Sequence, residues 1–68
     1  MAITYKKLWK LLIDRDMSKA ELRELSGVGA STFSKMNKNE YVSLEVLVKL
    51  CVALNCELGD IVEIVRGD

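Results

Sequence analysis

Residues 17–36 read MSKAELRELSGVGASTFSKM, a run that divides into two short helical segments. Ser18 and Glu21 have the S-x-x-E spacing of a capping box, in which each side chain satisfies a backbone N–H of the first helical turn. A helix therefore begins just after Ser18. Gly27 can take the left-handed conformation that ends a helix, and Gly29 then stands at the N-cap of the next one. The run predicts two short helices joined by a tight turn.

The second of these helices has one narrow apolar face, formed by Phe33 and Met36. The rest of its surface carries small or hydrophilic side chains: Ala30, Ser31, Thr32, Ser34, Lys35, Asn37 and Lys38. Short hydroxyls and a lysine let a helix approach another surface closely and hydrogen-bond to base edges and phosphates in a DNA major groove. A solvated surface helix explains the same residues, so this segment alone leaves both interpretations open.

Length and composition predict one domain over residues 1–68. Half of the residues are apolar and none is proline, which argues against a disordered chain or a flexible linker. A chain this small buries only about 60% of its unfolded surface, so every helix has to contribute to one core. The longest apolar run, residues 50–54, is far too short to cross a bilayer, and the N-terminus lacks the pattern of a secretory signal. We therefore expect a cytoplasmic protein with no membrane segment.

Helical periodicity extends over the rest of the chain. A first helix is expected from about Thr4, as its cap, to Arg15. A fourth is expected between Ser43, as its cap, and Asn55. The apolar positions of residues 58–65 continue the pattern and predict a fifth helix, and no segment has the pattern of a strand. The expected fold is an all-α, compact five-helix bundle.

The formal net charge is zero, but the two signs are unevenly distributed. Residues 1–38 carry eight Lys or Arg against four Asp or Glu, whereas residues 39–68 carry two against six, which gives +4 and −4. A dipolar molecule whose basic half contains the two short helices would orient on DNA while its non-specific attraction stays modest. The same charges would also simply keep a small domain in solution.

Nearly the whole chain resembles the compact, stand-alone members of the Cro and phage-repressor class of helix-turn-helix transcriptional regulators, often called Xre-type and carried by many bacteria. The resemblance is carried by five segments: YKKLWKLLID at 5–14, SKAELRELSGV at 18–28, VSLEVLVKLC at 42–51, ALNC at 53–56 and GDIVE at 59–63. It implies a lambda-repressor-like bundle of five helices with a helix-turn-helix. The activity that it implies is sequence-specific binding of double-stranded DNA by a homodimer at a pseudo-palindromic operator.

The resemblance also implies which residues contact DNA. Base contacts fall at the start of the second helix of the motif, on Ala30, Ser31, Thr32, Ser34 and Lys35. Lys35 can donate to O6 and N7 of guanine, whereas the hydroxyls reach a base or the adjacent phosphate. Contacts that position the DNA backbone fall on Ser18, Lys19, Lys38 and Asn39. Asn39 is also a candidate for a left-handed residue in the loop after the motif.

Two departures from the family pattern bear on specificity. Arg23 stands at the fifth position of the motif, where many members have alanine or glycine and the two helices cross closely. The stem of an arginine can lie along the apolar surface with its guanidinium in water. The recognition face also lacks the paired Gln, Asn or Arg side chains that commonly make bidentate base contacts. Specificity is therefore expected to be modest or to depend on DNA shape.

Other chemistry has little support in the sequence. The chain has no histidine and its two cysteines alone cannot make a zinc site, so we expect no metal and no cofactor. Cys51 falls on the buried face of the fourth helix and Cys56 in the turn after it, which indicates small core residues in a reducing compartment. No pair of catalytic groups stands out and no small-molecule ligand is evident, so an enzyme is not expected.

The fifth predicted helix has more apolar surface than one small core consumes, which indicates a partner. We expect a homodimer interface at Ile61, Ile64 and Val65, with Trp9 as a neighbour. The alternative function is a protein-interaction module, such as an antitoxin or an adaptor, that has the same fold and binds DNA weakly or not at all.

Overall fold

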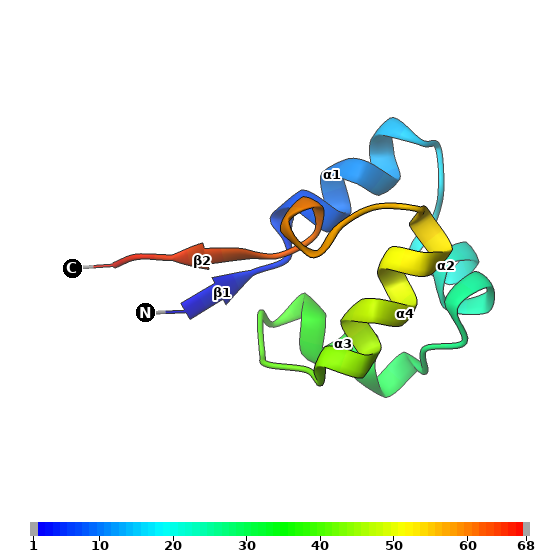
Figure 1. Cartoon of the computed structure of the whole chain (residues 1–68). Helices are drawn as coiled ribbons and strands as arrows, with labels where there is room; N and C mark the ends of the chain where they lie inside the picture. Colours follow the sequence, from blue (N-terminus) through cyan, green and yellow to red (C-terminus); the bar gives the residue numbers. More distant parts are fainter. Residues whose placement is uncertain (1, 68) are drawn as a thin grey trace.

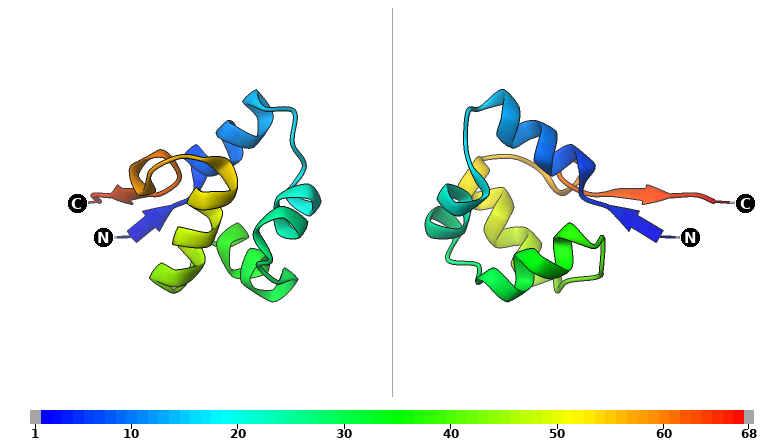
Figure 2. Two further views of the ribbon diagram at one scale, coloured as in Figure 1. Left: turned by 45° about the vertical axis from the view of Figure 1, so that its right-hand side comes forward. Right: turned by 180° about the vertical axis from the view of Figure 1, so that it is seen from behind.

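The computed structural model describes residues 2–67 of the chain (Figure 1). In this part the chain forms four α-helices, one 3-10 turn and a two-stranded sheet. The elements are, in order, β1 (Ala2–Thr4), α1 (Lys6–Asp14), α2 (Lys19–Ser26), α3 (Ala30–Asn37), α4 (Leu44–Leu54), η1 (Leu58–Asp60) and β2 (Glu63–Val65). The helices make up the body of the molecule, and the two strands project from it together as a ribbon (Figure 2).

The predicted signals at the ends of α2 and at the start of α4 are confirmed. Ser18 Oγ accepts a hydrogen bond from the Glu21 N–H at 3.1 Å, and Glu21 Oε1 accepts one from the Ser18 N–H at 2.9 Å, which completes the capping box. Gly27 ends α2 in the left-handed conformation, with a φ of 76°. Ser43 caps α4 by accepting from the Val46 N–H at 3.2 Å. Each signal acts within one helical turn, so it depends little on the rest of the fold.

The C-terminal segment is not the predicted fifth helix. A single 3-10 turn at residues 58–60 leads to an extended segment that pairs antiparallel with β1, in the register Ala2–Val65, Ile3–Ile64 and Thr4–Glu63. β-Branched side chains favour a strand at residues 63–65, and Gly59 weakens any helix that includes it. The fold is therefore mostly helical with a small sheet, and the expectations of five helices and of no strand are wrong.

The pairing of β1 also moves the start of the first helix. Thr4 belongs to the strand and α1 begins at Lys6, although Thr4 Oγ1 still accepts a hydrogen bond from the Lys6 N–H at 3.2 Å. Tyr5, between them, is fully buried, and its hydroxyl donates to the carbonyl oxygen of Glu40 at 2.7 Å. Burial raises the pKa of this phenol. Tyr5 thus anchors the start of α1 to the loop that follows α3.

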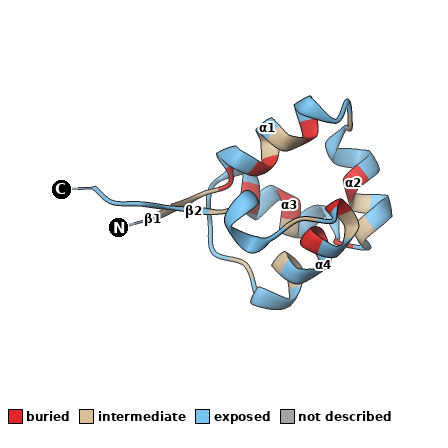
Figure 3. Cartoon of the chain, turned by 45° about the horizontal axis from the view of Figure 1, so that its top comes forward, coloured by how far each residue is buried: buried red, intermediate tan, exposed pale blue. Residues whose placement is uncertain are grey.

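All four helices turn their apolar faces into one core (Figure 3). Two long-range hydrogen bonds hold the C-terminal half of the chain against α1. The Arg15 guanidinium donates to the Leu54 carbonyl, and Lys7 Nζ donates to the Gly59 carbonyl at 3.1 Å. The buried core side chains are Tyr5, Leu8, Leu12, Leu22, Val28, Phe33, Met36, Leu50, Cys51, Leu54 and Ile61.

Candidate nucleic-acid interface

Hydrogen bonds of the Ser26 side chain hold the turn between α2 and α3. Ser26 Oγ donates to the Leu22 carbonyl at 2.7 Å and accepts from the Val28 N–H at 3.3 Å. Val28 is only 6% exposed and pins the turn to the core, as predicted. Gly29 then occupies the N-cap of α3 with an extended backbone, also as predicted. The two helices and their turn therefore form a helix-turn-helix whose geometry is set by internal contacts.

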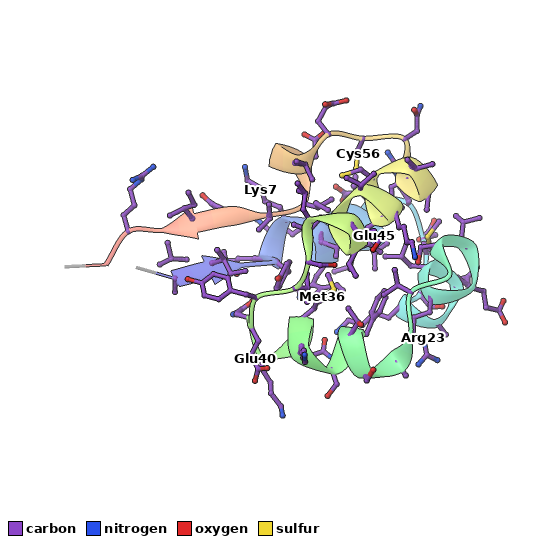
Figure 4. All side chains as sticks on the ribbon, turned by 60° about the horizontal axis from the view of Figure 1, so that its bottom comes forward. Lys7, Arg23, Met36, Glu40, Glu45 and Cys56 are labelled. Carbon is purple, nitrogen blue, oxygen red and sulfur yellow. The ribbon has the colours of Figure 1, made fainter. Side chains whose placement is uncertain are left out.

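The outer face of α3 presents most of the predicted base-contacting residues to solvent. Phe33 and Met36 point into the core, as their spacing predicts, and Thr32 is half-buried. The other predicted base contacts are exposed: Ala30, Ser31, Ser34 and Lys35. In Figure 4, α3 runs along the edge of the molecule between the labelled Arg23 and Glu40. This edge has short side chains beside a lysine, so another surface can approach the α3 backbone closely.

Lys19, a predicted phosphate contact, joins three helices. Its Nζ donates a hydrogen bond to Asn37 Oδ1 at 2.7 Å and lies 4.1 Å from the centroid of the Trp9 ring. The Trp9 and Phe33 rings lie 6.3 Å apart between centroids. Trp9, predicted as a neighbour of a dimer interface, is half-buried at this junction. Asn37 was outside the predicted contact set, because no local pattern indicates a bond between two helices.

Of the other predicted phosphate contacts, Ser18 and Asn39 make hydrogen bonds within the chain. The hydroxyl and the N–H of Ser18 are both bonded to Glu21 in the capping box. Asn39 is left-handed as predicted, with a φ of 57°, and its Oδ1 accepts from the Tyr5 N–H at 3.2 Å. Lys38 is exposed at the C-cap of α3, where its cation is accessible to a phosphate.

Arg23 lies at the crossing of α2 and α3, where the family pattern has a small residue. Its side chain is half-buried. With Lys19, Ala20, Ala30, Phe33, Ser34 and Asn37 it lines a surface hollow of about 250 Å³ between the two helices. That the arginine stem lies along the apolar surface of the crossing stays a prediction.

The residues predicted for a dimer interface near the C-terminus separate into two groups. Ile61 is fully buried in the core of the single chain, so it presents no surface to a partner. Ile64 and Val65 lie on β2 and are 55% and 44% exposed. Within the described residues the sheet has two strands, and β2 pairs on one side only, with β1.

This arrangement corresponds to a known family. Residues 7–67 match the family model of the Cro/C1-type HTH DNA-binding domain, where HTH denotes helix-turn-helix. The chain belongs to this family. The resemblance that the sequence motifs indicate is therefore confirmed, and α2 and α3 supply the two helices of the motif.

A solved structure agrees with this assignment. The crystal structure of the transcriptional regulator VanUg, Form II, is similar to this domain with a TM-score of 0.88 and 63% sequence identity. The match covers 91% of this chain and 83% of the VanUg chain. No curated protein matches the chain.

Among residues 2–67, no helix has the length and apolar character needed to cross a membrane. The described residues also contain no group of three or more His, Cys, Asp or Glu side chains placed to hold a metal ion.

Proposed function

We propose that the protein is a transcriptional regulator that binds a pseudo-palindromic operator as a homodimer, with α3 in the major groove. The observation that carries this proposal is the exposed face of α3, where small side chains permit close approach and Lys35 supplies a donor for guanine. The family is a DNA-binding one, and the 63% identical VanUg is a transcriptional regulator, which supports the same function here.

In this binding mode α3 reads the sequence and its surroundings hold the DNA backbone. Lys19 and Lys38, both exposed, supply cations at the start of α2 and at the end of α3. Ser18 and Asn39 are next to them in sequence. The Ser18 hydroxyl hydrogen and the Asn39 side-chain NH2 group are not used in the bonds to the Glu21 N–H and the Tyr5 N–H, and would donate to phosphates. The proposed base contacts are Ala30, Ser31, Thr32, Ser34 and Lys35. Because only Lys35 is a long donor in this set, DNA shape carries part of the specificity.

The proposed dimer surface is β2. Among residues 2–67 no strand pairs with its outer edge, and a second copy could pair there about a twofold axis. Such pairing would extend the sheet across the dimer and cover the exposed Ile64 and Val65. Ile61 and Trp9 are engaged within the chain and are therefore left out of this surface. The two copies of α3 would then enter successive major grooves, about 34 Å apart.

Selection of bound sequences from random double-stranded DNA at physiological salt tests the proposal. We expect enrichment of an inverted repeat whose half-sites lie about 10 base pairs apart. Enrichment of an isolated half-site would overturn the dimer. A pool without any enriched sequence, or binding that does not weaken with salt, would overturn operator recognition.

A second candidate function, a protein-interaction module, is favoured by the outer face of α4. Leu44, Val48 and Val52 follow one another at intervals of one helical turn and are 63%, 47% and 77% exposed. An apolar stripe of this kind is typical of a surface that contacts another protein. The selection experiment separates the two functions, because an interaction module with no DNA function leaves the pool unenriched.

A further inference from the structure

The C-terminal end of α4 brings two cysteines together. Asn55 is left-handed with a φ of 53°, and the Asn55 N–H donates to the Val52 carbonyl at 3.3 Å. The Cys56 N–H donates to the Cys51 carbonyl at 3.0 Å. These two bonds define a Schellman motif, which is frequently accompanied by a contact between the side chains of its first and last residues. In this chain those residues are Cys51 and Cys56.

The backbone geometry meets one requirement for a disulfide, a short separation of the two Cα atoms. With standard bond lengths, a 3.0 Å bond from the Cys56 N to the Cys51 O keeps the two Cα atoms within about 7 Å of each other. Both cysteines also line one surface hollow of about 390 Å³, with Val48, Val52, Asn55, Glu57 and Leu58. Figure 4 labels Cys56 where the chain leaves α4. The hollow therefore brings a small reagent to Cys56, beside the buried Cys51.

The two thiols differ in accessibility. Cys51 is only 8% exposed, and burial, with a further contribution from the neighbouring Cys56, raises the pKa of its thiol to about 11. Cys51 is thus protonated at neutral pH and is a poor nucleophile toward reagents in solution. Cys56 is less buried and lies in the turn, so it meets a reagent first.

We propose that Cys51 and Cys56 form a site that hydrogen peroxide converts to an intramolecular disulfide. The Cys56 thiolate attacks one peroxide oxygen, the O–O bond breaks, and hydroxide leaves, which gives a sulfenic acid on Cys56. The Cys51 sulfur then attacks the Cys56 sulfur, and the sulfenic oxygen leaves as water with the Cys51 proton. Two electrons pass from the two thiols to the peroxide. The product ties the last turn of α4 to the segment that leads to η1 and β2.

Peroxide treatment of the full chain, followed by intact mass measurement and thiol counting, tests this site. We expect a monomer that is about 2 Da lighter and has no free thiol, reversible by dithiothreitol. The Cys51→Ser variant should instead accumulate a sulfenic acid on Cys56 that dimedone traps. The Cys56→Ser variant should keep its Cys51 thiol free at the same peroxide dose.

Treatment in concentrated urea provides the matched control, because it removes the Schellman motif and leaves the sequence spacing unchanged. The fraction of intramolecular disulfide should fall several-fold in urea, in favour of sulfinic acid and linked dimers. An equal fraction of intramolecular disulfide with and without urea would show that the folded structure does not promote this disulfide, and would overturn the proposal. A folded chain that gives mainly sulfinic acid or intermolecular disulfide would also overturn the proposal.

Discussion

The ammonium group of Lys19 lies 4.1 Å from the centroid of the Trp9 ring and donates a 2.7 Å hydrogen bond to Asn37 Oδ1. One side chain of α2 therefore contacts both α1 and the end of α3. A cation over an indole face is attracted by the quadrupole of the ring, and the amide oxygen of Asn37 adds a charge-assisted hydrogen bond. These contacts hold a positive charge at the edge of the helix-turn-helix that we propose to face DNA.

Replacing Lys19 should affect stability and DNA affinity together. For Lys19→Ala we expect about 0.5–1 kcal/mol less free energy of unfolding, because the cation–π contact of an exposed lysine is worth no more. Binding of all DNA sequences should weaken alike, and the slope of log affinity against log salt should fall by about one. Urea unfolding and fluorescence anisotropy at several salt concentrations measure the two effects.

Trp9→Leu is the control for Lys19→Ala. It removes the ring and keeps the cation, so it should lower stability through lost packing against Phe33 and leave the salt slope of DNA binding unchanged. An unchanged slope for Lys19→Ala would mean that this lysine has only a structural role.

Lys35 should determine preference at one base pair. For Lys35→Ala we expect a loss of about 1–3 kcal/mol in operator binding and a relaxed preference at a single position, because the lysine donates to guanine in the proposed mode. Lys49→Ala makes the same charge change on the exposed surface of α4 and should leave that preference intact. Competition binding with operators varied at each position measures the effect. Uniform weakening at every position would assign Lys35 to phosphate contact instead.

Gly27 and Gly29 allow the left-handed turn to be tested without a change in packing. A Cβ added at either glycine meets no atom within 4 Å, but only Gly27 has a positive φ, 76°. Gly27→Ala should therefore cost about 1–2 kcal/mol of unfolding free energy, from backbone strain alone. Gly29→Ala should cost less than Gly27→Ala, since its extended backbone suits alanine and the lower entropy of the unfolded chain offsets the poorer N-cap. Equal losses in urea unfolding would contradict a left-handed end of α2.

Local signals predicted the helix-turn-helix well, whereas contacts between distant segments were missed. The capping box at Ser18 and the left-handed Gly27, Asn39 and Asn55 each depend on a few neighbouring residues, so the sequence carries them directly. The strand at residues 63–65 forms because it pairs with residues 2–4, at the other end of the sequence. No local pattern in residues 63–65 indicates that partner. The apolar residues of 58–65 fit a helical repeat equally well, which explains the wrong fifth helix.

The same reasoning applies to the site. The exposed face of α3 follows from the spacing of Phe33 and Met36, so most of the predicted base contacts are exposed as expected. The junction of Trp9, Lys19 and Asn37 joins three helices, and its geometry depends on how they pack. Sequence patterns identify which residues face outward on one helix. They do not identify which residues of different helices meet.

Stability should decline in acid partly through Glu21. The Ser18 N–H, and then the Ser18 hydroxyl, hold the pKa of the Glu21 carboxyl below its ordinary value of 4.5. The stabilisation from this carboxylate is therefore complete above its pKa in the unfolded chain, and is lost as pH falls through the lower pKa of the folded chain. Glu21→Gln keeps an acceptor for the Ser18 N–H and removes the titration. Urea midpoints measured between about pH 6 and pH 3 should fall less steeply for this variant, and parallel curves would contradict the assignment.

Ile64 should control dimer formation if β2 is the partner surface. It is 55% exposed beside the outer edge of β2, so Ile64→Lys places a charge where a second copy would cover it and should raise the dimer dissociation constant at least tenfold. Ile13 on α1 is 73% exposed, and Ile13→Lys makes the same chemical change away from the sheet. Sedimentation equilibrium of the two variants separates an effect of position from one of net charge. A wild-type monomer at high micromolar concentration, or an equal effect of both substitutions, would exclude β2 as the dimer surface.

Because operator affinity in the proposed mode depends on two linked half-sites, Ile64→Lys should also weaken binding to the full inverted repeat more than binding to one half-site.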